Sequence, residues 1–465
     1  MYSPAMNSVW TLPRQSQRAA AAPLAAPLLR VPSPLQTNGT RRIIEGDLAP
    51  DREIKAGSRL LIISRHQSYL THGLHKYPAK FFPELPRWAV QRYAREGPVI
   101  DPMCGSGTVN IEALLTRQPS IGADVDPFAR LLAGVKTTPL SAQTLAKIWE
   151  WLVSAIWERT PPVQIVLPDF PRRDTLWFRP DISEELGLIR SAIHAIPFWQ
   201  FRVRKADRQR YRDFFLVAMS SIVRAVSNAD NNCTRTVVRA RLNKRIIPGM
   251  ALELFRKAAE QSIGRMAEFE TACPRDVPVE IMADDARALS RPDESVELAV
   301  TSPPYINAVD YPRTHQLEMS WLELWPDGPM ANLKRHHIGT EVVRAKEYAD
   351  LHQTGIVDLD ALLADIYDVD RRRSFIIYKY FEDMHRNLAE VRRVLRPGGR
   401  YVVVVGNNMI RKRLVPTHQF LAEIAEEVGF ELETYFCSEV IRHFIKVPRK
   451  ERINDDWVLV LRKGH

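Results

Sequence analysis

Short apolar runs alternate with stretches of helical spacing in the middle of the chain. Val99–Asp101 predicts a buried strand, and a helical pattern at 109–115 follows it after a Gly-Ser-Gly turn. Ser120–Asp124 predicts a second strand, and Pro127–Val135 predicts a second helix. The order strand, helix, strand, helix predicts an α/β domain built on a parallel sheet.

The same two patterns return in the last third of the chain. A long helix is predicted at 375–395, where Pro397-Gly-Gly399 ends it, and an amphipathic helix is predicted at 418–428. Further strands are predicted at 279–282, 296–300, 400–405, 431–436 and 457–461. These elements complete the sheet that begins at Val99.

Three segments depart from this alternation and divide the chain. Residues 1–50 are predicted to form a disordered tail rich in Ala and Pro, and 310–370 reads as irregular. Residues 141–278 are predicted to form a mostly helical, basic insert. The insert separates the two parts of the α/β domain, 51–140 and 279–465.

Composition narrows the class of protein. Of the 465 residues 45% are apolar and 26% are charged, and no stretch approaches the roughly 20 apolar residues of a membrane span. The four cysteines stand far apart, with no spacing typical of a disulfide framework or a metal site. We therefore expect a soluble cytoplasmic protein with no metal and no membrane partner.

Positive charge is concentrated in the insert. The formal charge of the chain is +10, and residues 200–250 hold twelve Lys or Arg against three Asp. Such a cluster favours binding of a polyanion, although a solvated basic face is the simpler alternative. The candidate nucleic-acid contacts are Arg202, Arg204, Lys205, Arg208, Arg210, Arg235, Arg239, Arg241, Lys244 and Arg245.

The turn Asp101-Pro-Met-Cys-Gly-Ser-Gly-Thr108 between a strand and a helix is typical of a ligand-binding loop. No lysine follows Gly107, which disfavours a triphosphate-binding loop, and Asn110 replaces the third glycine of a dinucleotide-binding motif. The candidate binding residues of this turn are Asp101, Pro102, Gly105, Gly107 and Thr108.

Acidic residues at successive strand ends indicate which ligand the turn takes. Asp101 can accept from the ammonium of a methionine moiety, and Asp124 can accept from two ribose hydroxyls. Asp126 is a secondary candidate, and Asp285, or its neighbour Asp284, can accept from an adenine amino group. Together these roles fit S-adenosylmethionine.

A second motif, Thr301-Ser-Pro-Pro-Tyr305, follows a predicted strand. The amino group of a nucleic-acid base is a poor nucleophile because its lone pair is delocalised. The Ser302 hydroxyl and the Pro303 carbonyl can hold the amino hydrogens and localise that lone pair. Pro303 and Pro304 fix the backbone, and Tyr305 offers a flat face for a base swung out of its stack.

These residues together resemble the DNA amino-methyltransferases, which modify cytosine N4 or adenine N6. The segment His75–Phe81 is similar to the family segment that closes over the methionine part, which makes Tyr77 and Lys80 candidate cofactor contacts. Leu395–Gly399 resembles a turn common to class I methyltransferases. About 190 residues separate the cofactor and catalytic motifs, because the insert lies between them.

The resemblance implies a Rossmann-like class I methyltransferase sheet that binds S-adenosylmethionine and methylates a base flipped out of double-stranded DNA. Serine at position 302 favours cytosine N4, and adenine N6 is the alternative. An RNA base amino-methyltransferase and a nucleic-acid-binding protein with a vestigial methyltransferase fold are further alternatives. A restriction enzyme is a possible partner.

Overall fold

The computed structural model describes residues 34–39, 41–63, 67–78, 81–169, 174–239, 244–274, 276–306, 309–325, 328–439 and 455–465. Residues 1–33 of the predicted tail therefore lie outside the described residues, as do the candidate contacts Lys80 and Arg241. No helix within the described ranges is long and apolar enough to cross a bilayer.

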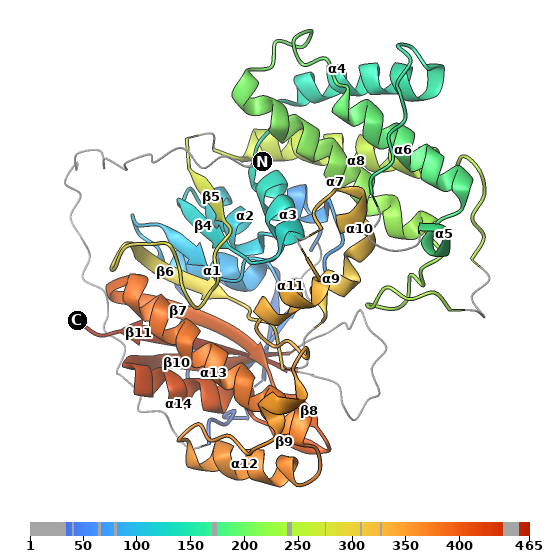
Figure 1. Cartoon of the computed structure of the whole chain (residues 1–465). Helices are drawn as coiled ribbons and strands as arrows, with labels where there is room; N and C mark the ends of the chain where they lie inside the picture. The colour runs from blue at the N-terminus through green and yellow to red at the C-terminus, as the bar shows by residue number, and fades with distance from the viewer. Residues whose placement is uncertain are drawn as a thin grey trace, which may run out of the picture.

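A nine-stranded sheet runs through the molecule in the order β1-β2-β10-β11-β7-β6-β3-β4-β5 (Figure 1). Strand β11 is antiparallel to both of its neighbours, and every other pair in the sheet is parallel. The strands are β1 Arg41–Glu45, β2 Ser58–Ile63, β3 Val99–Asp101, β4 Ser120–Ala123, β5 Val279–Met282, β6 Val296–Thr301, β7 Leu395–Gly406, β10 Phe430–Glu439 and β11 Asp455–Lys463, and a separate pair is formed by β8 Asn408–Ile410 and β9 Arg413–Val415. The predicted α/β class is confirmed.

Both faces of the central strands are buried, because alternate side chains point to opposite sides of the sheet. Leu298 and Val300 of β6 pack in one apolar cluster with Trp88. Ala299, between them, packs on the other face with residues such as Phe381. Helices therefore cover the sheet on both sides.

The covering helices follow the strands in sequence. Helices α1 Glu84–Tyr93 and α2 Thr108–Leu115 contribute Trp88 and Val109 to the first cluster. Helices α13 Arg371–Val394 and α14 Thr417–Val428 contribute to the second. Helix α3 Pro127–Thr137 leads from β4 into the insert, and the short η1 Leu70–Gly73 packs beside α3 and α8.

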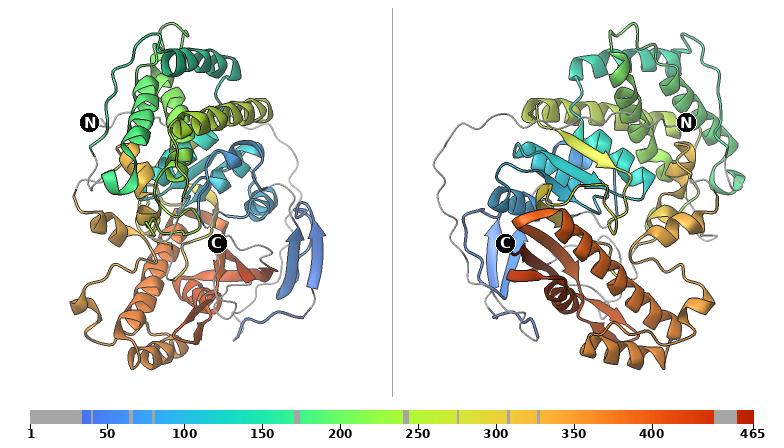
Figure 2. Two further views of the ribbon diagram at one scale, coloured as in Figure 1. Left: turned by 90° about the vertical axis from the view of Figure 1, so that its right-hand side faces the viewer. Right: turned by 60° about the vertical axis from the view of Figure 1, so that its left-hand side comes forward.

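Helices of the insert gather at one end of the molecule, beyond the β3-β4-β5 part of the sheet (Figures 1 and 2). They are α4 Ala142–Val153, η2 Ser154–Glu158, α5 Asp174–Trp177, α6 Pro180–His194, η3 Lys205–Asp207, α7 Arg208–Val226 and α8 Met250–Ala272. Their apolar residues form a core that also includes Phe128 and Leu132 of α3. The insert is thus packed firmly on the sheet domain.

Two expectations from the sequence need correction. Residues 41–45, assigned to the disordered tail, form strand β1, because pairing with β2 buries Ile44. The segment 310–370, expected to be irregular, holds several short helices whose lengths are too small to give a clear periodic pattern. These are α9 Tyr311–Thr314, α10 Gln316–Trp321, α11 Met330–His336, η4 Ala345–Tyr348 and α12 Val357–Tyr367.

Strand order reverses direction between β3 and β6. From β3 the chain proceeds outward through β4 and β5, and then returns to the other side of β3 with β6 and β7. In open parallel sheets, ligands bind in the crevice outside the carboxyl ends of the strands at such a switch point. Both sequence motifs begin there, at Asp101 and Thr301.

Candidate functional site

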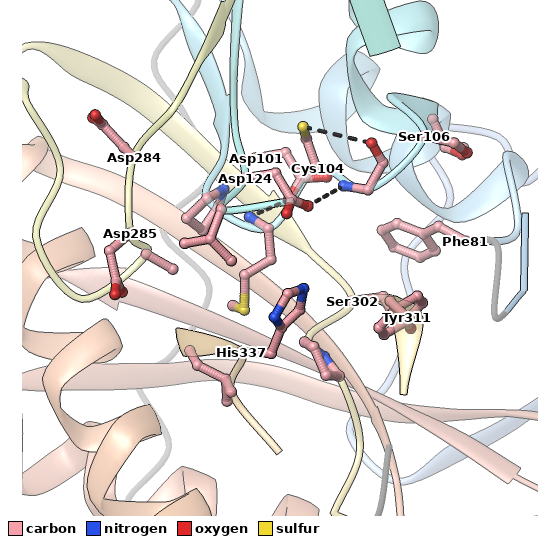
Figure 3. A pocket seen from close by; sticks show the side chains of 18 of the residues that line it. Phe81, Asp101, Cys104, Ser106, Asp124, Asp284, Asp285, Ser302, Tyr311 and His337 are labelled. Carbon is pink, nitrogen blue, oxygen red and sulfur yellow. Dashed lines mark hydrogen bonds between the residues drawn. The ribbon is translucent and has the colours of Figure 1, made fainter. Parts of the chain in front are cut away.

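A pocket lies at this switch point and encloses about 780 Å³ of space, including its open mouth. It brings together the cofactor turn, the end of β4, the loop after β5 and the start of the Ser-Pro-Pro-Tyr motif. Its walls are formed by Tyr77, Phe81, Asp101, Pro102, Met103, Cys104, Gly105, Ser106, Thr108, Asp124, Val125, Asp284, Asp285, Ala286, Ser302, Pro304, Tyr311, His336, His337 and Ile338. In the view of Figure 3, Asp285 and Phe81 lie at opposite ends.

The glycine turn is shaped by contacts that exclude larger residues. Gly107, immediately before α2, has φ +81°, and an added Cβ would lie 3.0 Å from the Cα of Ala133. An added Cβ at Gly105 would lie 3.3 Å from the ring of Tyr77. Glycine at 107 therefore permits both the left-handed turn and the close packing of α2 on α3.

Asp101 links the two motifs. Its Oδ1 accepts hydrogen bonds from the Thr301 hydroxyl, at 2.7 Å, and from the Met103 N–H, at 3.1 Å. Both bonds reach the same oxygen, so Oδ2 remains available to a ligand in the pocket. Burial raises the pKa of this carboxyl to about 7.

Asp124 supports the turn from the end of the neighbouring strand. Its two carboxylate oxygens accept from the Gly105 N–H at 2.9 Å and from the Asp126 N–H at 2.8 Å, and Figure 3 shows the first of these bonds. Burial raises the pKa of this carboxyl, and the nearby Asp126 raises it further. Each oxygen retains a lone pair for a hydroxyl donor.

Asp126 has a different position from the one expected. Its side chain caps α3 by accepting from the Phe128 N–H at 2.8 Å, and it does not line the pocket. Its Oδ2 lies 3.7 Å from His337 Nε2. Burial alone would raise the pKa of Asp126, but His337 and the helix N–H groups hold it below its usual value.

The two acids after β5 both reach the pocket. Asp285 forms an ion pair with Arg287, with 2.6 Å between the carboxylate and the guanidinium, and Arg287 also contacts Asp383. This pairing lowers the pKa of Asp285 against the opposing effect of burial. Asp284 accepts from the Ser290 N–H at 2.6 Å.

The Thr301–Tyr305 motif lies only partly in the pocket. Ser302 and Pro304 line the pocket, whereas Pro303 and Tyr305 do not. The Tyr305 hydroxyl donates to Asp456 Oδ1 at 2.8 Å, near the start of β11. Burial raises the pKa of Asp456 to about 6. Tyr305 is therefore fixed through its hydroxyl by a residue that the sequence did not single out.

A stack of aromatic rings, missed from the sequence except for Tyr77, closes one side of the pocket. Tyr77 stacks on His315 at 5.2 Å and on Tyr311 at 5.6 Å between ring centroids, and Tyr311 in turn stacks on His337 at 6.4 Å. We call these four residues the ring stack. Burial lowers the pKa of His315 to about 3, so this ring is neutral at physiological pH.

No local signal identifies these rings. The His337 side chain is only 12% exposed. Its Nδ1 lies 2.9 Å from the Leu333 carbonyl. The positions of Tyr311, His315 and His337 depend on short helices that pack against the segment around Tyr77, which is distant in sequence.

The basic residues of the insert form two groups rather than one. Helix α7 has 19 residues and is about 28 Å long. Arg202, Arg204, Lys205, Arg208 and Arg210 precede it or lie in its first turn, and Asp207 pairs with Arg204 and Arg210. Arg235, Arg239, Lys244 and Arg245 follow its other end.

Lys244 is used inside the protein. Its ammonium donates to the carbonyls of Arg224, Ser227 and Ala229 and to Asn231 Oδ1, at 2.7–3.1 Å. Burial lowers its pKa to about 8. The lysine thus holds the loop after α7 in shape, which is a different role from a direct contact with a polyanion.

We expect Lys244→Met to lower the free energy of unfolding by about 2 kcal/mol, because several buried carbonyls lose a charged donor. Urea denaturation followed by circular dichroism would measure the change. Lys205→Met is the matched control, since Lys205 is exposed and makes no such bonds among the described residues. Equal stability of both variants would refute this role for Lys244.

The family model and the curated relatives that match this chain are methyltransferases. A family model described as the RMKL-like methyltransferase domain matches residues 88–153. The type II methyltransferase M.MvaI of Kocuria varians is 24% identical over 407 residues, which are 82% of this chain and 85% of the relative. M.BsoBI of Geobacillus stearothermophilus is 20% identical, over 80% of this chain and 81% of the relative.

Two solved structures are also similar to this chain, at low TM-scores. A putative DNA modification methylase of Thermus thermophilus complexed with S-adenosyl-L-methionine has a TM-score of 0.21 and 20% identity, covering 39% of this chain and 51% of that one. The rRNA methyltransferase aviRa of Streptomyces viridochromogenes has a TM-score of 0.29 and 14% identity, covering 86% and 94%.

Proposed function

We propose that this chain is an S-adenosylmethionine-dependent DNA amino-methyltransferase that methylates the N4 amino group of a cytosine in double-stranded DNA. One observation carries this proposal. Ser302, Asp101 and Asp124 all line one pocket at the switch point of the sheet. The cofactor-binding and base-binding motifs, about 200 residues apart in sequence, are joined there by the bond from Thr301 to Asp101.

The residues of the pocket fit the cofactor. Bound S-adenosylmethionine supplies an electrophilic methyl group on a sulfonium sulfur. Asp101 Oδ2 is a buried acceptor suited to the methionine ammonium, and Asp124 is suited to the ribose hydroxyls. Asp284 or Asp285, at the other end of the pocket, would accept from the adenine amino group. Gly105 also lines the pocket, and its lack of a side chain would let the cofactor lie close to the backbone.

The acceptor base would be held by the Ser-Pro-Pro-Tyr motif. The Ser302 hydroxyl and the Pro303 carbonyl would accept the two amino hydrogens and direct the nitrogen lone pair at the methyl group. The nitrogen would displace the methyl group directly from the sulfonium sulfur, which would leave as a neutral thioether, and the nitrogen would lose one proton to solvent, with no covalent bond to the protein. Tyr305 does not line this pocket, so we assign it a positioning role: its bond to Asp456 would hold the motif in place beside the base.

Serine at position 302 is the basis for favouring cytosine over adenine. A method that reads N4-methylcytosine and N6-methyladenine, applied to DNA from cells that express this chain, tests the proposal. We expect N4-methylcytosine at one short sequence, absent from cells that express Ser302→Ala. N6-methyladenine in its place would overturn the cytosine assignment, and methylation of RNA alone would overturn the DNA substrate.

Cofactor affinity is expected to depend on pH through Asp101. The carboxylate binds the ammonium only when it is deprotonated, and its pKa is raised to about 7 by burial. Affinity should therefore fall by about fivefold from pH 7.5 to about pH 6, and it should also fall above about pH 8 as the amino group of the ligand loses its proton.

Isothermal titration with S-adenosylmethionine across this range is the measurement. In Asp101→Asn the loss below pH 7 should disappear, because the amide does not titrate. A pH profile identical to that of the wild type would mean that another group, such as the nearby Asp124, controls the affinity.

A further inference from the structure

A second pocket adjoins the first and shares Tyr311, His337 and Ile338 with it. It encloses about 830 Å³, including its open mouth. Arg235 of the insert forms one wall, the segments 309–313 and 334–342 form others, and Arg372 of α13 completes it. The pocket therefore lies between the insert and the second half of the sheet domain, beside the first pocket.

Positive charge exceeds negative charge on its walls. Arg235, Arg313, Lys334 and Arg372 face two carboxylates, Asp310 and Glu341. Both carboxylates are already paired, Asp310 with Lys334 and Glu341 with Arg373, each at 2.6 Å. Neither Arg235 nor Arg313 has a side-chain hydrogen bond or ion pair with any described residue, so two guanidinium groups are available to an anion.

The loop that carries Arg235 is held in place. The Thr236 hydroxyl, next in sequence, donates to the Thr314 carbonyl at 2.8 Å and is buried. The Arg224 guanidinium donates to the carbonyls of Asp230 and Thr234 at 2.9 and 3.2 Å. Arg235 is therefore positioned opposite Arg313 by the same bonds that dock the insert on α9.

We propose that this second pocket binds a phosphate of the DNA strand next to the target nucleotide, through Arg235 and Arg313; the inference rests on the proposed function. A base that occupies the first pocket stays covalently linked to its own backbone, so its flanking phosphates lie near the shared wall. The planar guanidinium fork matches phosphate oxygens. The pocket would thus hold the strand in register while the base is out of the stack.

The test is DNA affinity as a function of salt. A fluorescent duplex carrying the sequence found methylated is titrated with wild type, Arg235→Ala and Arg313→Ala at about 50 to 200 mM salt. We expect each substitution to weaken binding by about 3- to 10-fold and to reduce the slope of log K against log salt by about 1. Affinity for S-adenosylmethionine should not change, which also verifies folding.

Arg52→Ala is the matched control. Arg52 is exposed, and its carbonyl contacts Arg92 of α1 at the amino ends of the strands, opposite the site. For Arg52→Ala, the slope of log K against log salt should equal that of the wild type. Unchanged slopes in Arg235→Ala and Arg313→Ala, with a wild type that methylates the duplex, would overturn the phosphate site. A wild type that transfers no methyl group to DNA would instead overturn the proposed function.

Discussion

Ser302→Ala is expected to lower kcat for methyl transfer about 100-fold or more, while affinity for S-adenosylmethionine stays within about threefold of the wild type. The hydroxyl is proposed to accept a hydrogen of the amino group as its lone pair is directed at the methyl group. That bond strengthens in the transition state, so its loss lowers kcat rather than cofactor binding. Ser302 lines the pocket but makes none of the bonds that hold the cofactor turn.

Transfer of labelled methyl groups to DNA under single-turnover conditions would measure this effect. Ser295→Ala is the matched control, because Ser295 lies at the other end of β6 and bonds only the Pro292 carbonyl among the described residues. Its kcat should be unchanged. A Ser302→Ala variant with nearly full kcat would show that Ser302 has no role in methyl transfer. The reason for favouring cytosine over adenine would then be lost.

Asp124→Ala should weaken S-adenosylmethionine binding about 100-fold, with kcat at saturating cofactor reduced much less. The carboxylate is proposed to take two ribose hydroxyls, and a hydrogen bond to a charged group contributes about 1.5–3 kcal/mol. It also accepts from the Gly105 N–H, so its loss loosens the turn that the ligand contacts.

Calorimetric titration of the cofactor would test the assignment. Asp284→Ala is the comparison, since Asp284 lines the same pocket but follows a different strand, β5. We expect its affinity to fall no more than about fivefold, because Asp285 stands beside it as an alternative acceptor. Similar losses in both variants would contradict the assignment of the ribose to Asp124.

The sequence predicted the strands around the site well, because fully buried strands carry a strong local signal. Val99–Asp101 and Val279–Met282 have the bounds predicted for them. Strands β1 and β2 were not predicted. Strands β1 and β2 pair with each other, but they join the rest of the sheet only through β10, which is distant in sequence, so no local signal places them.

The acids of the site could be named from the sequence, but their surroundings could not. Asp101 ends a strand, Asp124 and Asp285 follow strands, and the structure brings all three to one pocket. Tyr311 and Asp456 reach the site only through tertiary packing, and no motif surrounds either of them. The basic run is visible in the sequence, yet its division between the two ends of α7 became visible only from the length of that helix.

Strand pairing also sets a time scale for synthesis of the protein. Strand β2 is hydrogen-bonded to β10 across about 380 residues. A ribosome that adds roughly 5–20 residues per second needs about 20–80 s to reach β10 after it has made β2. Until then Leu60 and Ile62 lack their final neighbours on an unpaired edge, which is a surface prone to aggregation. The first strands to leave the ribosome are therefore among the last to be covered, and slower growth or chaperone supply should raise the yield of folded protein.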